Sequence, residues 1–260
     1  MDATLLRAAC VGASMGADIA INYPLWIIAK RVGAGLSPAV PPLSRLYVGG
    51  GALWLSLGPT TVIEDGATSA LQALAPGRDL LSAAFSGVVA GLCVTSQVEH
   101  VITVAHARGA GILGTARSCL KERGAFFLLF PPGMVATACR EIPFAATLFH
   151  VRPLLSRRFG AAAEASAAER VLCECLCGCA ASAVASPASH APSVVAAYQQ
   201  ATGAPLLRAV ADLHAAGGWR TFFRGLAART VSLAGTFTVV PVALDALTRR
   251  CGALVAPEEN

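Results

Sequence analysis

The chain has 260 residues and a formal net charge of +5, and 55% of its residues are hydrophobic while only 13% are charged. A soluble domain carries about 25% charged residues, so this chain has too few charges to cover a soluble surface. Intrinsic disorder is excluded as well, because disordered chains have low hydrophobicity. The composition therefore predicts an integral membrane protein, and the length accommodates about six spanning helices of ~20 residues each.

Six apolar stretches follow one another along the chain, at residues 5–29, 51–74, 80–105, 132–156, 170–200 and 229–248. Each contains a glycine, a proline or a charged residue, and ionisable side chains at membrane depth normally face a bundle interior or a wet cavity. Long connectors (30–50, 106–131 and 201–228) alternate with short ones (75–79 and 157–169). This alternation predicts an all-α membrane protein of three helical hairpins around a central polar space.

Small residues recur four positions apart in the first, third and fifth stretches. This spacing is typical of transmembrane helices that pack closely, although it also occurs in generic helix contacts. The pairs are Gly12 and Gly16, Gly87 and Gly91, and Gly178 and Ser182.

Arginine dominates the positive charge, since Lys30 and Lys121 are the only lysines. Proteins that bind nucleic acids usually show a basic stripe or patch, whereas this chain spreads its charge, so we expect no nucleic-acid partner. Charged loops beside anionic headgroups fit the pattern better, and membrane lipids are the expected partners.

Four of the nine cysteines alternate with other residues along the fifth stretch, namely Cys173, Cys175, Cys177 and Cys179. On a helix, side chains two residues apart point about 200° away from each other, so the four cannot converge on one metal ion. We favour a role as small apolar filler and keep a metal or redox site as the alternative. The sequence has no catalytic triad, nucleotide-binding glycine motif or zinc-protease motif, so we expect neither enzymatic activity nor a cofactor.

An internal repeat is the strongest pattern in the sequence. Three segments share an aromatic residue, a glycine shortly after it and a later helix breaker, and the aromatics lie 83 and 93 residues apart. The aromatics are Tyr47, Phe130 and Phe223, and the glycines are Gly49, Gly133 and Gly225. The pattern divides a single domain of residues 1–260 into repeats at about 5–75, 79–157 and 169–250.

Three blocks of sequence resemble the mitochondrial carrier family: Asn22–Leu25, Arg140–Phe144 with Phe149, and Gly218–Arg229. The resemblance covers about residues 5 to 250. It implies a pseudo-threefold barrel of six transmembrane helices in the mitochondrial inner membrane. It also implies termini in the intermembrane space, short matrix helices in the long connectors, and bound cardiolipin.

The matrix gate of that family places an acid two residues after a proline and a base three residues further on. Here Pro24 is present, but Trp26 and Ala29 stand in the two charged slots, and Lys30 comes one residue late. In the second repeat only Glu99 is charged, and the third repeat holds neither charge. The resemblance would pair Lys30 and Glu99 with the fifth helix, where the slots are apolar.

At the opposite gate only Asp245 matches the family. We therefore interpret Pro24, Trp26, Lys30, Glu99 and Asp245 as vestigial gate positions. Trp26 is expected to act as an apolar plug, and Glu99 is expected to lie at a helix end near water.

The family contacts its solute one turn before the breaker of each even-numbered helix. The corresponding candidates here are Ser56, Arg140 with Glu141, and Ser232. Arg140 is a candidate clamp for a carboxylate, because a guanidinium binds a carboxylate through two parallel hydrogen bonds. The alternative is that Arg140 and Glu141 simply neutralise each other inside the barrel.

The sequence leaves two functions, of which we favour the first and keep the second as the alternative. The degenerate gates favour a carrier-like barrel that no longer alternates its access between the two sides of the membrane. Such a barrel would serve as an accessory subunit of a respiratory-chain complex. The Arg140–Glu141 pair favours a divergent but active carrier of a small carboxylate or amino acid.

Overall fold

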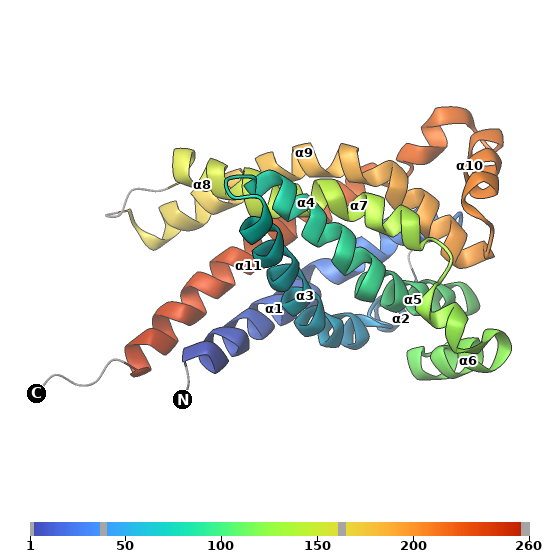
Figure 1. The fold of residues 1–260 in the computed structure, drawn as a ribbon, viewed down its shortest axis with the longest axis horizontal. Helices are drawn as coiled ribbons and strands as arrows, with labels where there is room; N and C mark the ends of the chain where they lie inside the picture. The colour runs from blue at the N-terminus through green and yellow to red at the C-terminus, as the bar shows by residue number, and fades with distance from the viewer. Residues whose placement is uncertain (1–2, 37–40, 161–164, 256–260) are drawn as a thin grey trace, which may run out of the picture.

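The computed structural model describes residues 3–36, 41–160 and 165–255, and within these ranges every regular element is helical (Figure 1). Six long helical rods are joined by short connecting helices. The elements are α1 (Ala3–Gly33), α2 (Leu43–Leu46), α3 (Gly50–Leu74), α4 (Asp79–Ala90), η1 (Gly91–Thr95), α5 (Ser96–Arg108), α6 (Ile112–Leu129), α7 (Met134–Ala146), η2 (Thr147–Val151), α8 (Arg152–Phe159), α9 (Ala167–Thr202), α10 (Leu206–Ala215), η3 (Gly218–Phe223) and α11 (Leu226–Val255).

The six rods coincide with the six apolar stretches of the sequence. Four rods are single helices, α1, α3, α9 and α11, and the other two are α4–η1–α5 and α7–η2–α8, each continuous through a π-helical turn. Three segments of the described chain are long and apolar enough to cross a membrane: Asp79–Arg108, Ala167–Thr202 and Gly218–Cys251. The chain is therefore an all-helical protein with the features of a membrane protein.

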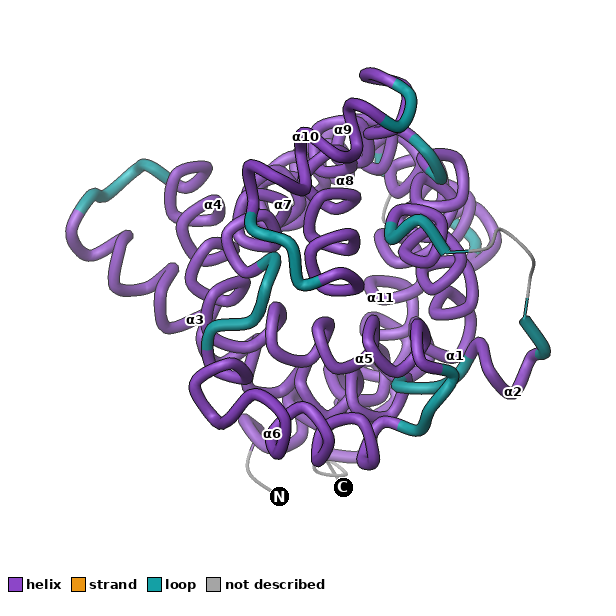
Figure 2. The backbone as a smooth tube through the Cα atoms, turned by 90° about the vertical axis from the view of Figure 1, so that its right-hand side faces the viewer, coloured by secondary structure: helices purple, strands orange, loops and turns teal. Residues whose placement is uncertain are grey.

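The rods close into a ring in chain order. Each rod packs against the next one, and α11 returns to pack along α1. Figure 2 looks onto this ring from the end that carries α6 and α10. At the other end of the molecule α1 begins and α11 ends (Figure 1). The long connectors and the chain ends thus lie at opposite ends of the ring.

Left-handed glycines precede three of the rods. Gly49 before α3, Gly133 before α7 and Gly225 before α11 have φ values of 94°, 86° and 82°. L-residues with a side chain rarely adopt this conformation, so these turns require glycine. They are the three glycines that the sequence pattern aligned.

Close packing depends on glycine at α4 and η1. A Cβ atom added at Gly87 would lie 2.7 Å from the carbonyl oxygen of Glu141, and one added at Gly91 would lie 2.9 Å from the Cα of Ala138. The small-residue spacing in this rod therefore coincides with a close contact, and the structure shows that the partner is α7. At Gly12 the same addition meets nothing within 4 Å, whereas at Gly16 it would lie 3.4 Å from the Nε1 atom of Trp54 on α3.

Serines are frequent among the buried residues, beside buried apolar clusters, and many large apolar side chains are exposed. Exposed apolar side chains are expected on a surface that faces lipid. Fully buried serines include Ser14, Ser82, Ser86, Ser96, Ser186 and Ser189, and exposed apolar side chains include Leu55, Phe85, Leu172, Leu176, Val184 and Val231.

Candidate functional site

A buried ionic cluster joins three rods near the connector end of the ring. The Oε2 atom of Glu99 on α5 accepts a hydrogen bond from Nζ of Lys30 on α1 at 2.7 Å. The same oxygen accepts one from Nη1 of Arg140 on α7 at 2.8 Å. Arg140 also pairs with Glu141, its neighbour on α7. No side chain in the cluster is more than 9% exposed. We define Lys30, Glu99, Arg140 and Glu141 as the ionic cluster.

This arrangement changes the interpretation of Glu99 and Lys30. Glu99 is not a helix-end group near water, because it is 3% exposed and lies inside the rod α4–η1–α5. Lys30 and Glu99 pair with each other rather than with the fifth rod. A buried carboxylate needs such partners, and removing one partner of a buried ion pair typically costs about 3–5 kcal/mol.

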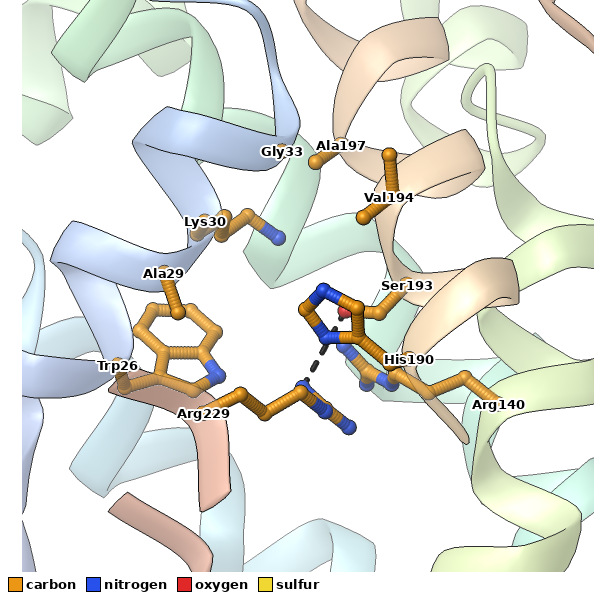
Figure 3. A pocket seen from close by; sticks show the side chains of 10 residues that line it. All are labelled: Trp26, Ala29, Lys30, Gly33, Arg140, His190, Ser193, Val194, Ala197 and Arg229. Carbon is orange, nitrogen blue, oxygen red and sulfur yellow. Dashed lines mark hydrogen bonds between the residues drawn. The ribbon is translucent and has the colours of Figure 1, made fainter. Parts of the chain in front are cut away.

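A small pocket adjoins the ionic cluster, and its walls come from α1, α7, α9 and α11 (Figure 3). Its free space holds about one water molecule, so a whole solute fits only if the surrounding rods separate. The lining residues are Trp26, Ala29, Lys30, Gly33, Arg140, His190, Ser193, Val194, Ala197 and Arg229.

Arg229 is the unusual member of the pocket. It is 5% exposed, and its guanidinium donates only to hydroxyl groups, those of Ser193 at 3.2 Å and Ser189 at 3.1 Å. Its Nε has no hydrogen-bond partner, and among the described residues no carboxylate lies within ion-pair distance of it. In Figure 3 the side chain reaches into the space between Trp26 and Arg140.

The pocket region carries an excess of positive charge. Lys30, Arg140 and Arg229 supply three cations, while the carboxylates of the ionic cluster supply two negative charges. Moving an unpaired ion out of water is costly, so the guanidinium of Arg229 favours an anionic group in the pocket.

His190 supplies a second unsatisfied polar atom. Its Nε2 lies 2.9 Å from the carbonyl oxygen of Arg224. A carbonyl oxygen only accepts hydrogen bonds, so Nε2 carries a proton, and when the ring is neutral Nδ1 is an acceptor. His190 Nδ1 is buried and has no hydrogen-bond partner among the described residues. The pocket walls therefore offer a cationic donor on Arg229 and a neutral acceptor on His190.

Trp26 forms one wall of this pocket. The Nζ of Lys30 lies 5.0 Å from the centre of the Trp26 ring, within the range of a cation–π interaction. The ring of Tyr23 packs against the same side chain with a centroid distance of 5.4 Å. Trp26 thus replaces the expected acid with an aromatic face beside Lys30.

The other candidate residues are not brought to the pocket. Ser56 donates a 2.7 Å hydrogen bond to the carbonyl of Leu53 in its own helix, and Ser232 is buried on α11 without lining the pocket. Asp245 pairs with Arg249 one turn further along α11, and both side chains are 58% exposed. Pro24 lies within α1.

The alternating cysteines share α9 but differ in environment. Cys177 is buried, Cys179 is exposed, and Cys173 and Cys175 are intermediate. Within residues 3–36, 41–160 and 165–255, no group of three potential ligands is placed to hold a metal ion.

A second set of polar contacts, not anticipated from the sequence, lies near the opposite end of the ring. Arg152 of α8 pairs with Glu174 of α9 and donates a 2.9 Å hydrogen bond to the carbonyl of Phe237 in α11. The hydroxyl of Ser156 donates to the same glutamate at 2.7 Å. One arginine thus connects three rods.

Sequence reasoning also missed Arg229 and His190. The available signal for Arg229 was an arginine at the start of the sixth apolar stretch, where a charge at membrane depth indicates function. No protein-family model matches the chain, and no curated protein matches it either, so the assignment of function depends on the geometry of this site.

Proposed function

We propose that this chain is a carrier-like solute transporter of the mitochondrial inner membrane, and that it moves a small carboxylate or amino acid. The observation that carries the proposal is Arg229, a buried guanidinium in a pocket inside the ring that has no carboxylate of the described residues within ion-pair distance. A buried cation without a counter-ion is costly, and a functional anion that binds there explains why it is present.

The residues have distinct roles in this proposal. Arg229 binds the carboxylate of the solute, and the ammonium of Lys30 adds positive charge on the facing wall. His190 Nδ1 accepts a hydrogen bond from the ammonium or hydroxyl group of an amino or hydroxy acid. In this proposal Arg140 positions the ionic cluster rather than binding the solute, because its guanidinium pairs with Glu99 and Glu141.

The ionic cluster is the proposed gate. It holds α1, α5 and α7 together at the connector end, and access from that side requires Lys30 and Arg140 to release Glu99 while the rods move apart. In this proposal all six rods cross the membrane as a pseudo-threefold barrel. Its termini lie in the intermembrane space, and cardiolipin binds at the matrix surface.

The proposal is tested by uptake into liposomes that contain the purified protein. A panel of radiolabelled amino, hydroxy and keto acids is offered to the wild type and to Arg229→Gln. We expect the variant to lose roughly 10- to 100-fold in uptake, because a hydrogen bond to a charged group contributes about 1.5–3 kcal/mol.

Arg208→Gln is the matched control, because Arg208 lies on α10 with a side chain that is 76% exposed. It should transport as well as the wild type. Equal uptake by the wild type and Arg229→Gln would exclude Arg229 as the anion site.

An accessory subunit of a respiratory-chain complex is the second candidate. It is favoured by the gate slots, since Trp26 replaces an acid and Asp245 forms an exposed pair within its own helix. Native-gel separation of mildly solubilised mitochondrial membranes, followed by mass spectrometry, distinguishes the two functions. Stoichiometric migration with a large complex supports the subunit, whereas migration near the monomer mass supports the transporter.

A further inference from the structure

Two cysteines from the opposite ends of the sequence meet where the ring closes. Cys10 is near the start of α1 and Cys251 is near the end of α11, 241 residues later, and their sulfur atoms are 3.7 Å apart. Cys10 is 4% exposed, whereas Cys251 is partly accessible. The close approach follows from the packing of α11 along α1.

This pair is independent of the pocket. Along α1, Cys10 and Lys30 are separated by 20 residues, which corresponds to about 30 Å in an α-helix. The two cysteines therefore lie near the chain ends, on the side of the molecule away from α6 and α10 (Figure 1).

We propose that Cys10 and Cys251 form a reversible disulfide that joins α1 to α11. A disulfide requires a sulfur–sulfur distance of about 2.05 Å, so the two atoms must approach by less than 2 Å, a distance that rotation about the Cα–Cβ bonds can supply. Both residues are free thiols in the structure.

The oxidant in this proposal is a small exchangeable disulfide, such as glutathione disulfide. The thiolate of Cys251, the more accessible residue, attacks one sulfur of the oxidant, and a mixed disulfide forms as one small thiol leaves. The thiolate of Cys10 then attacks the Cys251 sulfur and releases the second small thiol. The protein loses two electrons and two protons, and the oxidant is reduced to two thiols.

The bond would make the ring covalently continuous. The first and last rods could no longer separate at the end where the chain terminates, so alternation of access at that end would stop. This consequence rests on the proposed transport function, whereas the formation of the disulfide does not.

Disulfide formation is tested on the full-length protein in detergent, titrated with glutathione disulfide. After alkylation of the remaining thiols and proteolysis, mass spectrometry should identify one peptide pair that joins Cys10 to Cys251, and dithiothreitol should remove it. Cys10→Ser and Cys251→Ser should each abolish this species. Cys93→Ser, which alters an exposed cysteine on η1, should leave it intact.

Two results would overturn the proposal. One is full alkylation of Cys10 and Cys251 under conditions that oxidise other cysteines. The other is persistence of the same oxidised species in Cys251→Ser.

Transport provides a separate test of the consequence. Oxidised wild type should lose most of its uptake and regain it with dithiothreitol, whereas Cys251→Ser should be unaffected by the oxidant. Unchanged uptake by the fully oxidised protein would show that the disulfide between α1 and α11 does not stop transport. If no variant transports any solute, the proposed function fails while the peptide map still decides whether the disulfide forms.

Discussion

At the scale of single residues, the most informative contrast is between two buried arginines. Arg140 is neutralised by Glu99 and Glu141, whereas the hydrogen bonds of Arg229 within the described part of the chain go to the hydroxyls of Ser189 and Ser193. Removing one partner of the first arrangement would leave a buried charge unpaired, whereas the second arrangement already holds a buried cation without an ion-pair partner among the described residues, which is costly. Substitutions at the two sites should therefore have opposite effects on stability.

Replacing Arg229 by methionine should raise the thermal midpoint of the ligand-free protein by a few degrees, since 1 kcal/mol corresponds to about 2–4 °C in a chain of this size. The same change should remove the stabilisation that a bound carboxylate gives to the wild type. Differential scanning fluorimetry in detergent measures both effects. A lower midpoint without ligand would indicate that Arg229 is a structural residue.

Glu99→Gln should have the opposite effect. It leaves Lys30 and Arg140 without their shared carboxylate, so we expect a loss of about 3–5 kcal/mol in the free energy of unfolding. Asp245→Asn is the control, because its pair with Arg249 is exposed and such pairs contribute about 0–1 kcal/mol. Equal destabilisation by the two variants would contradict the burial of the ionic cluster.

At the scale of elements, glycine sets how closely α4 and η1 approach α7. Gly87→Ala or Gly91→Ala would push a methyl group into the α7 backbone, and such overpacking typically costs about 1–3 kcal/mol. Gly12→Ala adds the same methyl group in open space and should be neutral or slightly stabilising, since alanine favours helix formation. Thermal unfolding of the three variants gives the comparison, and similar midpoints would argue against the close contact.

At the scale of the whole molecule, the ring predicts the topology in the membrane. Six spans place both termini on the same side, whereas three spans would place them on opposite sides. Peptide tags at both ends should therefore be digested together when sealed vesicles are treated with a protease. A cleavage site inserted into the 201–228 connector should be protected in the same vesicles and cut in inverted ones.

Much of the fold could be predicted from the sequence, because long apolar runs determine where helices form. The predicted stretches 51–74 and 170–200 differ from α3 and α9 by three residues or fewer at each end. The left-handed glycines were predictable for a similar reason, since only glycine adopts that conformation without strain. These are local properties that a single segment contains.

The candidate site was predicted only in part, because pairing is a property of three dimensions. Lys30 and Glu99 are 69 residues apart. The resemblance to the mitochondrial carrier family would pair each of them with the fifth helix rather than with each other. The proposal for Arg229 rests on the absence of a carboxylate within ion-pair distance among the described residues, and no sequence pattern expresses the absence of a neighbour. The sequence left Arg140 either as a carboxylate clamp or as the partner of Glu141, and its ion pair with Glu99 could not be assigned from the sequence.

The return of α11 to α1 also has a consequence for synthesis of the chain. Asp18 on α1 accepts a 2.6 Å hydrogen bond from Asn22, four residues away, but its partner on another rod, the hydroxyl of Thr236, is 218 residues later. The hydrogen bond between Asp18 and Thr236 can form only after almost the whole chain has been synthesised. Until then the first helix exposes a carboxylate to its surroundings, so a chain that stalls before α11 should be a preferred substrate for membrane quality-control proteases.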